Sequence, residues 1–210
     1  RYPDGTKESY AYTAGNQTAS HTDRLGHTAA YTYDEQGNLL TETRFDGAAR
    51  SYTYDGDNRL TAQTDYNGAV TAYEYDKKGN LTRMVRPDGS SLVYGYNGKN
   101  QLTSIKDPEG NTVTLSYTGV SLTGIRDALG NQAAFAYDAF GNLISMTDPE
   151  GNTSRIEYDA EGRKLQEIDA LGGVTSYTFD NAGNVLSITE PMENTTSFTY
   201  DAGGNPLTAE

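Results

Sequence analysis

The chain has 210 residues, of which 35% are hydrophobic and 23 are glycine, so a compact aliphatic core is not expected. Its 17 tyrosines and five phenylalanines are too many for a disordered coil. Sixteen basic and 29 acidic residues give a net charge of −13, which argues against binding to nucleic acid or to anionic membranes. The absence of cysteine excludes disulfides, thiolate metal sites and cysteine nucleophiles, and no apolar run is long enough to span a bilayer. Because the chain begins with Arg1 rather than Met, we expect it to be a piece of a longer protein.

Aromatic residues recur at a fixed period along the whole chain. Tyr12 starts a column whose members are 21 residues apart, with a single step of 20 before Tyr137. A second aromatic or aliphatic residue stands two positions before each member, and Leu115 and Ile156 are its two aliphatic members. This pattern predicts one array of ten units over residues 1–210. The aromatic members of the two columns are Tyr10, Tyr12, Tyr31, Tyr33, Tyr52, Tyr54, Tyr73, Tyr75, Tyr94, Tyr96, Tyr117, Phe135, Tyr137, Tyr158, Tyr177, Phe179, Phe198 and Tyr200.

The unit of residues 65–85 shows the predicted elements in chain order. A first turn, Asp65–Gly68, reads D-x-x-G, which is typical of a type I turn closed by a glycine in the left-handed conformation. A strand over Val70–Tyr75 follows, in which large residues alternate with small or polar ones. A second D-x-x-G turn, Asp76–Gly79, leads to a return strand over Leu81–Val85. Each unit is therefore a β-hairpin.

Proline and asparagine support this assignment. Type I turns favour proline in the second place, and asparagine tolerates a left-handed backbone best after glycine. Proline takes the second place of the first turn at Pro3, Pro87, Pro108, Pro149 and Pro191. Asparagine replaces the glycine of the second turn at Asn16, Asn58 and Asn100.

The predicted fold class is all-β: a long antiparallel meander of about ten hairpins, which must curve or spiral. The two aromatic columns lie on one face of their strands, and we expect them to form rows that stabilise the sheet. The alternative is that the rows are a stacking platform for sugars or bases. Tyr66 lies in a turn outside the columns, so we expect it to contribute little to stability.

The string Tyr33–Leu40 (YDEQGNLL) resembles the signature of the Rhs or YD repeat family, as does Tyr137–Ile144 (YDAFGNLI). The resemblance covers essentially all of residues 1–210. Four departures affect individual turns: Thr13, Asn97 and Thr118 stand in place of the turn aspartate, and Glu193 stands in place of a turn glycine.

This resemblance implies a shell of β-sheet. In bacterial members such repeats enclose a toxic C-terminal domain, in polymorphic toxins and insecticidal toxin complexes, and in animal teneurins a similar barrel is part of an adhesion ectodomain. Bacterial members end in a self-cleaving aspartyl protease motif. Asp107–Gly110 and Asp148–Gly151 are similar to its centre, but each is followed by Asn rather than Leu, so we interpret both as turns. No catalytic residue is carried over.

No motif in the sequence predicts catalysis, a cofactor or a strong metal site. His21 and His27 lack zinc-type spacing, and we expect them at the surface. The run Asp55–Asn58 begins like a calcium loop, but the closing position is Tyr66 instead of glutamate, which leaves only weak calcium binding open. Carboxylate pairs of the kind used by glycosidases are not singled out, because the acidic residues stand at turn positions.

We therefore expect a non-enzymatic structural segment, secreted or at the bacterial cell surface. Its expected partners are a toxin or effector domain of the same polypeptide and the flanking repeats, with no nucleic acid and no membrane insertion. The alternative function is a cell-surface adhesin that binds glycans through exposed tyrosine rows. The terminal strands, near Thr6–Tyr12 and Leu207–Glu210, should have free edges through which copies associate.

Overall fold

The computed structural model describes residues 5–209, which fall into two units, residues 5–111 and residues 112–209. Within the described residues there is no helix, and so none that could cross a membrane. Pro3 lies outside the described residues.

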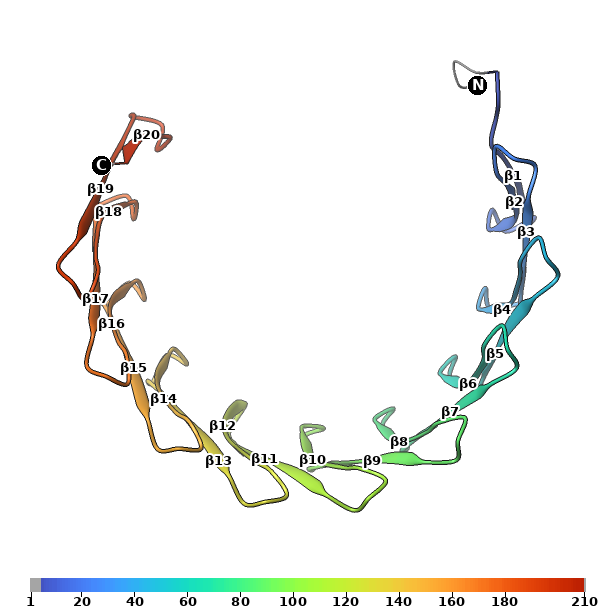
Figure 1. Cartoon of the computed structure of the whole chain (residues 1–210), viewed down its shortest axis with the longest axis horizontal. Helices are drawn as coiled ribbons and strands as arrows, with labels where there is room; N and C mark the ends of the chain where they lie inside the picture. Colours follow the sequence, from blue (N-terminus) through green and yellow to red (C-terminus); the bar gives the residue numbers. More distant parts are fainter. Residues whose placement is uncertain (1–4, 210) are drawn as a thin grey trace. The chain divides into compact units, whose positions relative to one another are not determined.

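Each unit is an antiparallel meander of ten strands, and within each unit every strand pairs with the next one along the chain (Figure 1). The predicted all-β meander is confirmed. The strands of the first unit are β1 (Ser9–Tyr12), β2 (Thr18–Thr22), β3 (Thr28–Tyr33), β4 (Leu39–Thr43), β5 (Ala49–Tyr54), β6 (Leu60–Thr64), β7 (Val70–Tyr75), β8 (Leu81–Val85), β9 (Ser91–Tyr96) and β10 (Leu102–Lys106). Those of the second unit are β11 (Thr112–Thr118), β12 (Ser121–Arg126), β13 (Gln132–Tyr137), β14 (Leu143–Thr147), β15 (Thr153–Tyr158), β16 (Lys164–Ile168), β17 (Val174–Phe179), β18 (Val185–Thr189), β19 (Thr195–Tyr200) and β20 (Pro206–Ala209).

Two kinds of turn alternate along the meander. The turns after odd-numbered strands, such as Asp76–Gly79, follow a column tyrosine and are called tyrosine turns here. The turns after even-numbered strands, such as Asp65–Gly68, are called return turns. Because neighbouring strands run in opposite directions, the two kinds lie at opposite margins of the sheet (Figure 1).

The turn geometry follows from the D-x-x-G pattern. In the turn at Asp76, the Gly79 N–H donates to the Asp76 carbonyl at 3.1 Å, and Gly79 has a φ of +88°. The left-handed conformation predicted for Asn16, Asn58 and Asn100 is confirmed by φ values of 63°, 61° and 62°. Glu193 adopts it as well, with a φ of 62°, so this departure leaves the turn intact.

Only the departure at Thr118 changes the turn type. Strands β11 and β12 are joined by the two residues Gly119 and Val120, and Thr118 pairs directly with Ser121. Gly119 has a φ of +64° whereas Val120 has no positive φ, which is the pattern of a type II′ turn. A glycine in the first loop position makes this shorter turn accessible.

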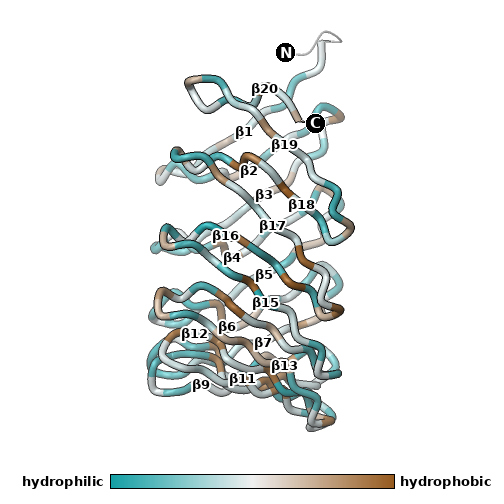
Figure 2. Tube along the Cα trace, turned by 90° about the vertical axis from the view of Figure 1, so that its left-hand side faces the viewer, coloured by the Kyte–Doolittle hydropathy of each residue, from teal (hydrophilic) through white to brown (hydrophobic). Residues whose placement is uncertain are grey.

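Both units are one layer thick. Among residues 5–209 no hydrophobic side chain is buried, and Gly124 is the one residue classed as buried. The hydrophobic positions lie mainly within the strands and the turns are mostly hydrophilic (Figure 2). The sheet therefore has no core, and its stability must come from contacts between neighbouring strands.

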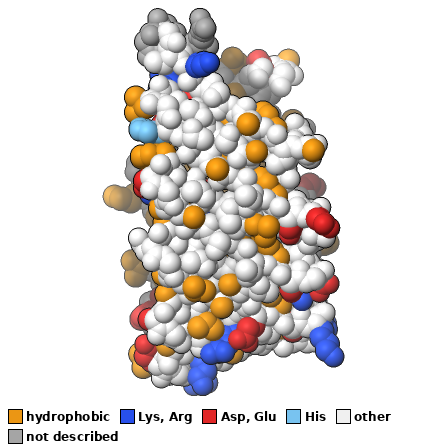
Figure 3. Space-filling view, turned by 90° about the vertical axis from the view of Figure 1, so that its right-hand side faces the viewer, with side chains coloured by type: hydrophobic (Ala, Val, Ile, Leu, Met, Phe, Trp, Pro, Cys, Tyr) orange, Lys and Arg blue, Asp and Glu red, His pale blue; other side chains and the backbone are white. Residues whose placement is uncertain are grey.

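The two faces of the sheet differ in chemistry. Residues paired across strands share a face, so Tyr73 with Met84 and Tyr75 with Leu81 define a tyrosine face. The opposite face carries many hydroxyl side chains, which form hydrogen-bonded pairs such as Thr32 with Thr41 at 2.6 Å. The side of the molecule seen in Figure 3 shows mostly backbone and uncharged side chains other than the hydrophobic ones, with hydrophobic side chains in small groups and charges near its margins.

Candidate functional site: the tyrosine face and the aspartate turns

The two aromatic columns occupy different places in the hairpin. First-column residues pair with the middle of the return strand, as Tyr73 does with Met84, whereas second-column residues pair with its first residue, as Tyr75 does with Leu81. A β-bulge lies directly before the second-column residue in each hairpin, as the register shift between Glu74 and Tyr75 shows. Most column side chains are half-buried, but Tyr10 and Tyr12 at the β1 end are 51% and 58% exposed.

Second-column tyrosines tie neighbouring hairpins together through their hydroxyl groups. The Tyr75 hydroxyl donates a 3.0 Å hydrogen bond to the carbonyl of Leu60, the first residue of the preceding return strand. Burial, helped by the nearby Tyr73, raises the pKa of the Tyr75 hydroxyl, so it stays a donor at neutral pH. The same bond spans 15 residues in five hairpins, with donors Tyr33, Tyr54, Tyr75, Tyr158 and Tyr200.

Sequence reasoning missed this role, although the sequence contains a signal for it. The first column accepts Leu115, Phe135 and Ile156, so it requires only a bulky apolar side chain. The second column is tyrosine at nine of its ten positions, with Phe179 as the exception. Tyrosine differs from phenylalanine only by its phenolic hydroxyl. The presence of this hydroxyl at nine of ten positions therefore indicates a hydrogen bond.

Aspartate organises the tyrosine turns at Asp34, Asp55, Asp76, Asp138, Asp159, Asp180 and Asp201 from the first position. Asp34 Oδ1 accepts hydrogen bonds from the Gln36 N–H at 3.0 Å and the Asn38 N–H at 2.8 Å, and Asp34 Oδ2 accepts one from Asn38 Nδ2 at 2.9 Å. The side chain and backbone of Asn38, with the Gln36 N–H, hold the pKa of Asp34 below its usual value. The asparagine after the turn glycine is thus a partner of the aspartate, which the sequence analysis did not identify.

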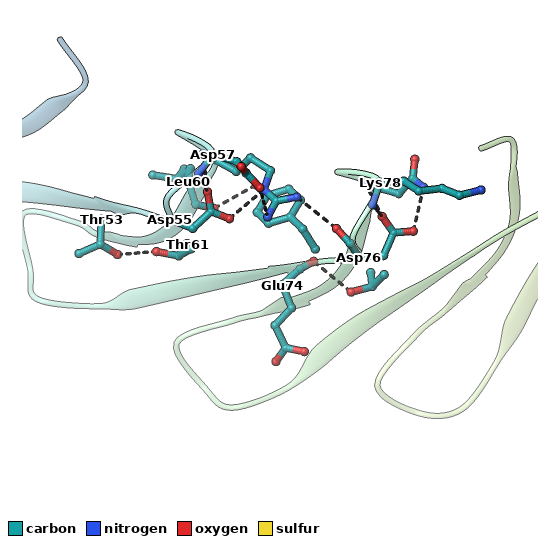
Figure 4. Close-up of polar contacts among 12 residues, drawn as sticks. Thr53, Asp55, Asp57, Leu60, Thr61, Glu74, Asp76 and Lys78 are labelled. Atoms are coloured by element: carbon teal, nitrogen blue, oxygen red, sulfur yellow. Dashed lines mark hydrogen bonds and ion pairs between the residues drawn. The ribbon is translucent and has the colours of Figure 1, made fainter. Parts of the chain in front are cut away.

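Side chains also link successive tyrosine turns. Arg59 pairs with Asp55 at 2.8 Å and donates through Nη1 to the Asp76 carbonyl of the next turn at 3.1 Å. Lys78 in turn donates to the Gly98 carbonyl at 3.1 Å. Figure 4 shows Asp55 and Asp57 in one turn and Asp76 and Lys78 in the next, with Glu74 pointing away from them. These contacts form a ladder along the margin.

Tyr66 makes contacts that its place in a return turn did not indicate, and its small contribution to stability stays a prediction. Its ring lies 5.3 Å from the guanidinium of Arg44 and 5.4 Å from that of Arg50, and desolvation together with the nearby Glu42 carboxylate raises the pKa of its hydroxyl. Arg50 also pairs with Glu42. The expectation of a minor contribution came from the turn position alone and took no account of the charged row that the register places beneath the ring.

The other candidate residues of the sequence take structural positions. His27 lies 3.1 Å from Asp23 and stacks on Phe45, while His21 stacks on Tyr10. Among residues 5–209 no group of histidine and carboxylate side chains is arranged to hold a metal ion.

The resemblances to a calcium loop and to a protease motif both fall on ordinary turns. The carboxylates of Asp55 and Asp57 both face the Arg59 guanidinium, which competes with any cation. Asp107 and Asp148 each accept the backbone and side-chain N–H groups of the asparagine four residues on.

Comparison with known proteins agrees with this geometry. A family model described as RHS Repeat matches residues 12–49, 54–91, 122–153, 158–191 and 179–210. No curated protein sequence matches the chain. The fold is similar to that of a chain in the crystal structure of TcdB2-TccC3-TEV, with a TM-score of 0.51 and 16% identity over 97% of this chain. It is also similar to a chain in TcdB2-TccC3-Cdc42, with a TM-score of 0.50, 15% identity and the same coverage.

The present chain spans 14% of the length of each of these two solved chains, and at such identities the likeness concerns the fold. The family match rests on the repeat itself and extends over most of the sequence. The chain therefore belongs to the RHS repeat family.

Proposed function

We propose that this chain is part of the wall of a shell that encloses a C-terminal toxin or effector domain of the same polypeptide. The observation that carries the proposal is a sheet one layer thick, with no buried hydrophobic side chain among residues 5–209. Such a sheet presents two open faces and is held by ties between neighbouring hairpins, as a wall requires. Membership of the RHS repeat family and the fold of the TcdB2-TccC3 chains support the same function.

The array would continue into flanking repeats, and its setting would be secretion or the bacterial cell surface. The net charge of −13 favours solubility outside the cell. We propose no catalytic role for this segment, because the turn aspartates already accept hydrogen bonds from their own turns. A carboxylate that is held in this way is a poor general base, since its pKa lies below the usual value.

The test is protection of the enclosed domain. A protease cleavage site is placed in the domain that follows the repeats in the complete polypeptide, and digestion is followed over time. We expect this site to be cut much more slowly in the complete polypeptide than in the isolated domain, because the wall excludes the protease. Equal cleavage rates in the two would contradict the proposal. The same site placed in an exposed return turn of the array is the control for protease activity.

Glycan binding is the second candidate, and one observation favours it. Tyr10 and Tyr12 are more than half exposed and stack on one another with ring centroids 6.4 Å apart. Exposed aromatic faces are unusual on a soluble protein and often mark binding sites.

A further inference from the structure

A row of aliphatic side chains runs across the last four hairpins. Each member directly follows the return-strand residue that pairs with the second-column aromatic. The members, here called the aliphatic row, are Ile144, Leu165, Leu186 and Leu207, which are 36%, 38%, 40% and 63% exposed. The four hairpins before them have threonine at the same place, at Thr61, Thr82, Thr103 and Thr123. The row is therefore confined to the second unit.

The aliphatic row lies on the face of the sheet opposite the tyrosine face. In the hairpin of β5 and β6 the same place is Thr61, whose hydroxyl is hydrogen-bonded to that of Thr53 at 2.9 Å (Figure 4). Thr53 stands between Tyr52 and Tyr54 in its strand, so it points away from both tyrosines. The bulge falls at the same place in the last four hairpins, which puts the row on this face as well.

The row opens at one end into a groove of about 600 Å³. Phe140, Ile144 and Glu157 are among its lining residues, and Phe140 in the tyrosine turn is 88% exposed. An equivalent groove in the first unit has Gln36 in place of Phe140. Exposed aromatic and aliphatic side chains in one continuous surface mark a site of interaction with another molecule.

The spacing of the row selects an α-helix as the partner. Its members occupy every second strand, so neighbouring members lie about 9.6 Å apart. Seven residues of α-helix rise about 10.5 Å, so an apolar side chain at every seventh position stays in step with the row. An extended segment repeats its side chains on one face about every 6.8 Å and does not match. The row spans about 29 Å, the length of a helix of roughly 20 residues.

The charges around the row select a basic partner. Residues 112–209 carry 13 acidic and four basic side chains, whereas residues 1–111 carry 15 and 12. The row runs beside the tyrosine turns of the second unit, because it lies near the start of each return strand. Arg163 pairs with Asp159 and Glu161 in one of these turns. The turn aspartates that form no ion pair with the described residues are Asp138, Asp180 and Asp201.

We propose that the aliphatic row and these acidic turns bind a basic amphipathic α-helix of a partner protein. The helix would place an apolar side chain at every seventh position against the row and lysine or arginine beside the turns. One larger apolar side chain would enter the groove beside Phe140 and Ile144. The proposal goes beyond the shell function and does not depend on it.

The test is binding of a synthetic peptide to the 210-residue chain. The peptide has three heptads and a final leucine, with leucine first in each heptad and alanine and lysine elsewhere. Fluorescence anisotropy measures its binding, and circular dichroism measures the helix that it gains. One control peptide has glutamate in place of lysine, and another has a central proline, which breaks the helix at nearly unchanged charge. We expect saturable binding of the lysine peptide with a gain of helix, and weak binding of both controls.

Two variants of the chain locate the site. Leu165→Thr and Leu186→Thr introduce the residue that four other hairpins have at this place, so the strands should keep their fold. Each should weaken binding of the lysine peptide on the order of tenfold, as expected for the loss of one buried leucine contact. Leu40→Thr is the matched control, because Leu40 holds the same place in the first unit. It should leave binding unchanged.

Binding that both row variants weaken and Leu40→Thr preserves supports the proposal. It is overturned by absence of saturable binding, by equal binding of either control peptide, or by row variants that bind as the unchanged chain does. Self-association that Leu165→Thr abolishes, measured by light scattering, would also overturn it, because a second copy would then cover the row. The comparison of the three peptides needs no variant of the chain. None of these outcomes bears on protection of an enclosed domain.

Discussion

At the scale of the residue, the two tyrosine columns have different roles, although the sequence analysis gave them the same one. First-column side chains contribute apolar surface to neighbours on the same face. Second-column side chains add a hydroxyl that satisfies a backbone carbonyl of the preceding hairpin, as Tyr75 does for Leu60. A carbonyl next to a bulge lies where the strand ladder is interrupted, so a side-chain donor is useful there.

This difference predicts unequal effects of the same substitution in the two columns. Tyr75→Phe removes the hydroxyl and should lower the free energy of unfolding by about 1 kcal/mol, the usual contribution of one hydrogen bond. Tyr73→Phe is the matched control in the same strand and should change it by less than about 0.5 kcal/mol. Urea unfolding at pH 7 measures both. Equal losses would show that the hydroxyl bond does not contribute.

At the scale of the element, the hairpin is defined by its turns. Seven of the ten tyrosine turns combine an aspartate that accepts local N–H groups with a fourth residue in the left-handed conformation. Both features are local, so a hairpin tolerates departures that keep the backbone conformation. Glu193 shows this in a return turn, where a residue with a side chain adopts a φ of 62°.

The strain at Glu193 predicts a stabilising substitution. An L-residue in the left-handed region costs roughly 1–2 kcal/mol, and glycine loses part of that advantage through the entropy of the unfolded chain. Glu193→Gly should therefore raise the free energy of unfolding by about 0.5–1 kcal/mol. Gly68→Ala is the reciprocal control: a Cβ there would meet no atom within 4 Å, so the φ of +82° alone should make it destabilising. Thermal unfolding checks both, and a loss of stability in Glu193→Gly would contradict the interpretation.

At the scale of the whole molecule, weak ties repeated many times replace a core. The turn aspartates are the most numerous of these ties, and local hydrogen bonds lower the pKa of twelve of them. They are Asp23, Asp34, Asp55, Asp76, Asp88, Asp107, Asp127, Asp138, Asp148, Asp159, Asp180 and Asp201. Protonation of these groups would act on every hairpin of the array at once.

The lowered pKa values predict loss of stability in acid. A carboxyl group whose folded pKa lies below its unfolded value, about 3.9 for Asp, binds protons more readily in the unfolded chain. Its contribution is fully present above that value and is lost as the pH falls through the folded pKa. The urea midpoint should thus fall steadily below about pH 4. Asp76→Asn should make this decline shallower, whereas an unchanged midpoint in acid would contradict the prediction.

Measurements at high salt distinguish the loss of the turn hydrogen bonds from the effect of the net charge on stability. Protonation relieves the repulsion of the −13 charge only down to the isoelectric point near pH 4.5, and below it the chain is net positive, so further protonation adds repulsion. In about 1 M salt the Debye length is only about 3 Å, so the general repulsion is screened while the short bonds within each turn persist. The part of the decline below pH 4 that comes from these bonds should therefore persist in high salt.

The open terminal strands predict self-association. All four residues of β1 and all four of β20 are exposed, and each of these strands pairs on one side only within its unit. Strand edges of this kind recruit other strands. Light scattering should show association that increases as salt screens the charge of −13. Thr208→Pro in β20 should reduce it, and a strict monomer at every salt concentration would show that the edges are protected.

The sequence by itself determined the repeat, the class of fold and the places of the turns. The expected strands Val70–Tyr75 and Leu81–Val85 coincide with β7 and β8, and the three turn asparagines have the predicted backbone conformation. These features depend on residues within one hairpin, where turn chemistry and the alternation of side chains act over a few positions. The 21-residue repeat occurs ten times, so the pattern of turns and strands can be recognised even where single units depart from it.

Only the tertiary structure decided which side chains meet between hairpins. The bond from Tyr75 to the Leu60 carbonyl and the contacts of Tyr66 with Arg44 and Arg50 join residues of different hairpins. Each depends on the register that the bulges impose. These contacts follow from the three-dimensional pairing of strands, because a shift of one residue moves every side chain to the other face.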